Sequence, residues 1–149
     1  MNGVNQAGDR AGMAAMPEVW QAEAEKLLAA VRRGLSTPKA RVALVLRLSL
    51  LAPPLPRAHH RRIARAILEA SAQQHQGEMF ELFGGDMVLL CRVPSVDVAS
   101  ERALHPASLP QAMARLFRAD VPGSISLATL WSLERDSTAL LAYTAEVTS

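Results

Sequence analysis

The feature that most constrains the fold is a hairpin pattern in the middle of the chain. Two apolar runs rich in β-forming residues, EMFELF at 78–83 and MVLLCRV at 87–93, are separated only by Gly84-Gly85-Asp86. Glycine adopts the positive φ angles of tight turns at low cost, and aspartate is common in turns. The stretch therefore predicts two short antiparallel strands joined by a turn.

The segments before and after this hairpin have the periodicity of strands or of helices. Strict alternation in RVALVLRLS, residues 41–49, predicts a strand with one fully apolar face and a second face that is apolar until Arg47. Residues 58–74 have helical periodicity with Ile63, Ile67 and Ala70 as the expected buried stripe. Residues 108–120 predict another helix, and residues 124–133 predict a fourth strand.

These elements define a fold class. Their order is βαββαβ, which predicts an α+β domain of the ferredoxin-like type: a four-stranded antiparallel sheet with two helices on one face. A helix at 16–34, which Gly34 is expected to end, precedes this core. A C-terminal helix that Asp136 is placed to cap follows it.

Length and composition predict one domain. The chain has 149 residues, half of them apolar, which is enough for a single buried core spanning residues 40–149. Residues 1–15 lack the apolar segment of a secretion signal and are expected to form a disordered leader. No apolar run is long enough to cross a bilayer, and the single cysteine, Cys91, fits a reducing cytoplasmic location.

The position of Gly84-Gly85-Asp86 between the second and third strands carries a family resemblance. This order, over roughly residues 40–147, resembles the GGDEF (diguanylate cyclase) family. The resemblance implies a bacterial signalling domain whose active members hold magnesium ions on acidic residues at the end of the first strand and at the turn. The glutamate of the family signature is also implied to help activate the attacking hydroxyl.

At those positions the chain departs from the family pattern. Arg47 and Ser49 stand where acids are expected at the end of the first strand, and Met87 replaces the glutamate of the signature. A hard divalent cation needs oxygen ligands, whereas a guanidinium repels it and a thioether binds it poorly. The expectation is that the domain is not an enzyme and has neither a metal site nor a cofactor.

A ligand site without catalysis stays open as an alternative. Its candidate residues form two groups. The first comprises Arg47 and the turn residues Gly84, Gly85 and Asp86. The second is the basic cluster at a helix start, His59, Arg61 and Arg62. Such residues would hold a nucleotide, GTP or a cyclic dinucleotide. The simpler interpretations are that Asp86 only forms the turn, that the cluster is a solvated face, and that Arg47 reaches water or an acid at the strand end.

The first helix also has two interpretations. Trp20, Leu27 and Val31 recur at heptad spacing and predict either packing on the domain's own sheet or contacts in a homodimer. A net charge of +2 and few aromatic residues do not favour a nucleic-acid partner.

The sequence as a whole predicts a catalytically inactive GGDEF-like regulatory module that acts through contacts with a partner protein or a second copy. The first alternative is a nucleotide sensor, and the second is an unrelated ferredoxin-like scaffold. The chain is also expected to be the front part of a longer regulator, of the kind in which such a module precedes an EAL-type domain.

Overall fold

The computed structural model describes residues 16–51, 54–93, 106–117 and 127–149. Within them lie four α-helices, α1 (Glu18–Ser36), α2 (Ala58–Gln74), α4 (Leu109–Leu116) and α5 (Ser137–Thr148). The strands are β2 (Arg41–Leu46), β3 (Glu78–Glu81), β4 (Met87–Arg92) and β5 (Ala128–Ser132), and short 3₁₀ turns cover Leu48–Leu50 and Pro106–Ser108. The predicted disordered leader lies outside the described residues.

The four strands form one antiparallel sheet in the order β3-β4-β2-β5. Strand β2 is central, with Leu44 opposite Leu89 of β4 on one side and opposite Leu130 of β5 on the other. Its alternation places Leu44 and Leu46 in one apolar core and Ala43 and Val45 in another. The prediction of an α+β domain with a four-stranded antiparallel sheet is confirmed.

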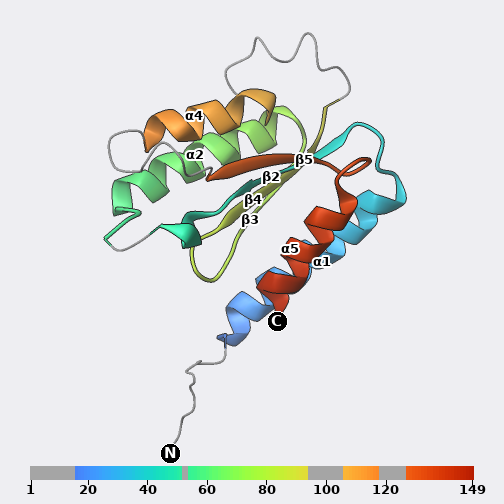
Figure 1. Ribbon diagram of the computed structural model, residues 1–149, viewed down its shortest axis with the longest axis horizontal. Helices are drawn as coiled ribbons and strands as arrows, with labels where there is room; N and C mark the ends of the chain where they lie inside the picture. The colour runs from blue at the N-terminus through green and yellow to red at the C-terminus, as the bar shows by residue number, and fades with distance from the viewer. Residues whose placement is uncertain (1–15, 52–53, 94–105, 118–126) are drawn as a thin grey trace, which may run out of the picture.

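Helices cover both faces of this sheet. Helices α2 and α4 lie on one face, and α1 and α5 lie side by side on the other (Figure 1). Leu27 of α1 and Leu140 of α5 are fully buried against Val88 of β4 in the second core. The two added helices therefore complete a three-layer arrangement, which leaves neither sheet face bare.

Two expectations, the buried face of α2 and the end of the first strand, are wrong. The buried residues of α2 are His60, Ala64, Leu68, Ser71 and Ala72. Of the predicted stripe, Ile67 packs partly buried against the core, whereas Ile63 is 41% exposed, so the buried face is rotated from the predicted one. The first strand ends at Leu46, three residues early.

Gly34 lies inside α1, which ends at Ser36. A Cβ on Gly34 would lie 2.6 Å from Cδ2 of Leu133, so this glycine permits close packing and does not end the helix. Within the described ranges, no helix is long and apolar enough to cross a membrane.

Candidate functional site at the Gly-Gly-Asp turn

Gly84-Gly85-Asp86 forms the turn that the sequence predicts. Both glycines have positive φ, 96° for Gly84 and 100° for Gly85. The N–H of Leu82 donates to the carbonyl of Asp86 at 2.8 Å, and the N–H of Gly85 donates to the carbonyl of Leu82 at 2.9 Å. Two successive positive φ angles match a hairpin turn that follows the twist of its strands, which explains why glycine occupies both positions.

The Asp86 carboxylate is buried and fully engaged within the chain. It is 3% exposed. Oδ1 accepts a hydrogen bond from the backbone N–H of Ser49 at 2.8 Å, and Oδ2 accepts one from the hydroxyl of Tyr143 at 2.7 Å. This one side chain therefore connects the turn, the segment after β2 and the C-terminal helix α5.

Arg47 adds a positive charge to the same cluster. Its guanidinium carbon lies 5.3 Å above the centre of the Tyr143 ring, a cation–π geometry. Its NH2 group lies 3.4 Å from Oε2 of Glu146, so Arg47 reaches an acid at the strand end, as one interpretation of the sequence held. Its Nε is buried without a hydrogen-bond partner among the described residues.

The environment keeps Tyr143 in its neutral form. Burial is the main cause that raises the pKa of its phenol above the ordinary value, and the negative charge and hydrogen bond of Asp86 raise it further. A phenol held protonated in this way remains a hydrogen-bond donor to the carboxylate. Arg47, Ser49, Asp86, Tyr143 and Glu146 are linked by these contacts and are here called the Asp86 cluster.

Ser49 and Met87, where the resemblance to the GGDEF pattern leads to an expectation of acids, have other roles in the structure. Ser49 contributes its backbone N–H to the cluster. Met87 is fully buried in the core beneath α2 and α4, so its thioether is a packing group. Among the described residues, no group of three or more histidine, cysteine, aspartate or glutamate side chains is arranged to hold a metal ion.

Arg61 of the basic cluster, together with Arg65 of α2, pairs with Glu81 of β3. Arg61 and Arg65 both donate to Oε2 of Glu81, at 3.2 and 2.6 Å. Burial opposes ionisation of Glu81, but the hydrogen bonds and charges of Arg65 and Arg61 outweigh it and lower the pKa of this carboxyl. His59 and Arg62 are exposed on α2.

His60, between these residues, is buried and not part of a solvated face. It is 3% exposed, its ring centre lies 4.8 Å from that of Phe117, and its Nδ1 accepts a hydrogen bond from the N–H of Arg57 at 3.3 Å. The basic cluster is thus divided among an ion pair, the protein core and solvent. The structure does not assemble its residues into one site.

The proposed dimer contacts of α1 are mostly inside the chain. Leu27 and Val31 are fully buried with Val45 of β2, so they are unavailable to a second copy in this fold. Their role as dimer contacts is a wrong expectation, because α1 packs on the sheet. Trp20 is half-buried and lies with its ring centre 6.3 Å from that of Phe83.

Sequence reasoning missed Tyr143 and Glu146 as members of the site. Tyr143 is the only tyrosine of the chain and lies in an apolar helix face. A buried phenol needs a polar partner, which was the one available signal that this helix approaches a polar group. Asp136, expected to cap α5, instead accepts a hydrogen bond from the N–H of Ser132 at 2.8 Å.

Comparison of the chain with protein-family models, with curated proteins and with solved structures finds no match. The resemblance to GGDEF domains therefore depends on the order of elements and the Gly-Gly-Asp turn alone. The geometry of the Asp86 cluster is the remaining guide to function.

Proposed function

We propose that the chain is a catalytically inactive GGDEF-like regulatory module, with a ferredoxin-like βαββαβ core, that acts through protein contacts. The strand order β3-β4-β2-β5, the antiparallel pairing and the position of α2 and α4 on one face support the ferredoxin-like assignment. The Gly-Gly-Asp turn between β3 and β4 supports the GGDEF-like one.

The engagement of the Asp86 carboxylate is the observation that carries the proposal. Each of its oxygens accepts a hydrogen bond from within the chain, and the neighbouring side chain at the end of β2 is a cation. Two-metal phosphoryl transfer needs anionic oxygens that are free to coordinate both ions. Here the carboxylate acts as an internal joint, which means that its hydrogen bonds fix α5 and the segment after β2 to the turn.

Exposed apolar side chains support a role in protein contacts. Phe83, beside the turn, is 53% exposed, and the ring centre of Trp20 lies 6.3 Å from its own. These two residues, with the exposed side chains of Val19 next to Trp20 and Leu50 next to Ser49, are here called the turn-end patch; Val19 is 71% exposed. Large exposed apolar side chains are typical of surfaces that bind another protein. A second copy of the chain is the first partner to test.

The purified chain is expected to form no cyclic dinucleotide from GTP with Mg²⁺, because both oxygens of the buried Asp86 carboxylate already accept hydrogen bonds from within the chain. Chromatography of the reaction measures turnover, and calorimetry of the same sample with GTP and with a cyclic dinucleotide measures binding. Turnover that disappears in Asp86→Asn would contradict the proposal. Binding without turnover that is lost in Arg47→Ala, but not in Arg62→Ala, would favour the nucleotide-sensor alternative.

Replacing Phe83 by serine is expected to weaken association of the chain by about tenfold or more, because loss of an apolar anchor costs more than 1 kcal/mol at an interface. Light scattering over a range of protein concentrations measures the association. Leu141→Ser, at a 38% exposed site on α5 outside the patch, is the matched control. A chain that stays monomeric at every concentration, or loses association equally in both variants, argues against self-contact through the patch.

A further inference from the structure

Three basic residues meet at the end of the sheet opposite the Gly-Gly-Asp turn. Arg41 of β2 and Arg92 of β4 are direct partners across the two strands, and Lys39 lies two residues before Arg41. Like charges directly opposite one another on neighbouring strands repel and are destabilising. The arrangement therefore carries a cost that the sheet itself does not require.

No acid among the described residues lies within ion-pair distance of these three side chains. The nearby carboxylate of Glu78 pairs with Arg33, whose NH2 lies 3.7 Å from its Oε1. Arg41 donates through Nε to the carbonyl of Thr37 at 2.8 Å, which leaves its two terminal nitrogens for another acceptor. Among the residues that the structure describes, none of the three cations forms an ion pair.

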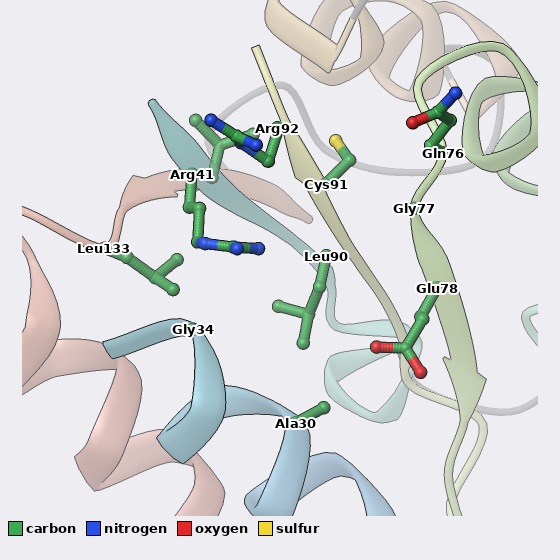
Figure 2. A pocket seen from close by; sticks show the side chains of 11 residues that line it. Ala30, Gly34, Arg41, Gln76, Gly77, Glu78, Leu90, Cys91, Arg92 and Leu133 are labelled. Atoms are coloured by element: carbon green, nitrogen blue, oxygen red, sulfur yellow. The ribbon is translucent and has the colours of Figure 1, made fainter. Parts of the chain in front are cut away.

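Two cavities share the arginine pair. An open hollow of about 350 Å³ is lined by Thr37, Pro38, Lys39, Arg41 and Arg92. A smaller cavity of about 90 Å³ continues between α1 and the sheet, and Arg41 and Arg92 line it as well. Figure 2 shows the Arg41 side chain directed into this smaller cavity with Glu78 on the opposite wall, whereas the Arg92 side chain lies at the rim, apart from the Arg41 guanidinium.

Two residues beside the cavities have left-handed backbone angles. Ala40, between Lys39 and Arg41, has a φ of 62°, and Gln76, on the wall of the smaller cavity, has a φ of 52°. Among the described residues, these are the two that adopt positive φ without being glycine. The N–H of Gly77 donates to the carbonyl of Ala72 at 2.7 Å, so Gln76 is the left-handed residue that ends α2. The N–H of Arg41 donates to the carbonyl of Pro38 at 3.1 Å, so Ala40 completes the turn that brings Lys39 and Arg41 to the hollow.

We propose that Lys39, Arg41 and Arg92 bind the phosphate group of a small phosphorylated molecule, with the phosphate at the arginine pair and the remainder in the open hollow. Three uncompensated cations favour a ligand with more than one negative charge. The planar guanidinium fork matches phosphate oxygens and binds them through paired hydrogen bonds. The hollow falls within the volume range of small-molecule sites.

Calorimetry of the full chain with inorganic pyrophosphate tests this site. Saturable binding is expected, and Arg92→Gln should weaken it at least about tenfold because a charge-assisted bidentate contact is lost. Arg62→Gln makes the same change of net charge at an exposed position on α2 and is expected to leave binding unchanged. Lys39→Gln provides a second variant on the proposed site.

Thermal unfolding separates ligand binding from a structural role. Without ligand, Arg92→Gln should leave the Tm unchanged or raise it, because the repulsion with Arg41 is relieved. In the wild-type chain, pyrophosphate should raise the Tm, whereas NaCl at matched ionic strength should not. An Arg92→Gln variant with a lowered Tm and unchanged pyrophosphate affinity would overturn the proposal.

The ligand class is decided by two further titrations. Ribose 5-phosphate binding more tightly than inorganic phosphate would identify a phosphate ester as the ligand, whereas the reverse order would identify free phosphate or pyrophosphate. Succinate is expected to bind more weakly than either. Equal binding of succinate, no saturation with pyrophosphate at millimolar concentration, or equal losses in Arg92→Gln and Arg62→Gln would each overturn the site.

Discussion

Replacing Asp86 by alanine is expected to lower the free energy of unfolding by about 3 kcal/mol. The carboxylate is buried and accepts hydrogen bonds from the Ser49 N–H and the Tyr143 hydroxyl, so its removal leaves two donors without their acceptor. Chemical denaturation at neutral pH, monitored by circular dichroism, measures the change.

Two matched variants give this prediction its meaning. Asp136→Ala also removes a carboxylate that accepts a backbone N–H at 2.8 Å, but at a half-exposed position, and should cost only about 1 kcal/mol. Tyr143→Phe removes one of the two donors to Asp86 and should fall between the two. An Asp86→Ala variant as stable as the wild-type chain would show that the carboxylate is not the internal joint described above.

The same measurement bears on catalysis. The negative charge of a carboxylate held ready for a metal ion is poorly compensated while the site is empty. Removing such a carboxylate therefore leaves the free energy of unfolding unchanged or increases it. A carboxylate that connects a turn to a helix has the opposite effect. The sign of the change on Asp86→Ala therefore distinguishes a retained reaction centre from a structural element.

Elements whose signal is local could be predicted from the sequence. Helix α2 has the predicted bounds, Ala58–Gln74, and the Gly84-Gly85-Asp86 turn lies where its composition placed it. Periodicity and turn chemistry act over a few residues, so they survive the context of the fold. The face that a helix buries is less local, which explains why Ile63 of α2 is exposed and His60 is buried.

The site was only half predictable for the same reason. Arg47, Ser49 and Asp86 come together because the C-terminal end of β2 and the turn of the β3–β4 hairpin lie at the same end of the sheet. The predicted order of elements implies this arrangement. Tyr143 and Glu146 join them from α5, and nothing local in the sequence fixes where that helix docks. Packing of α5 beside α1 decides it.

Replacing Leu27 by alanine is expected to lower the free energy of unfolding by about 2–5 kcal/mol, the range for a leucine removed from a filled core. The side chain is fully buried among residues of β2, β4 and α5, where the missing atoms leave a cavity. The contact lies within one chain, so the loss of stability caused by Leu27→Ala should be the same at every protein concentration. Denaturant titrations at several protein concentrations measure this loss.

Val19→Ala on the same helix is the matched control. Val19 is 71% exposed, so its truncation should change stability by less than about 0.5 kcal/mol. If α1 were instead a dimer seam, unfolding of the wild-type chain would shift to higher temperature with protein concentration by mass action, and Leu27→Ala would abolish that shift. Because Leu27 contacts the sheet of its own chain, the loss of stability should appear in full even in dilute samples where only monomer is present.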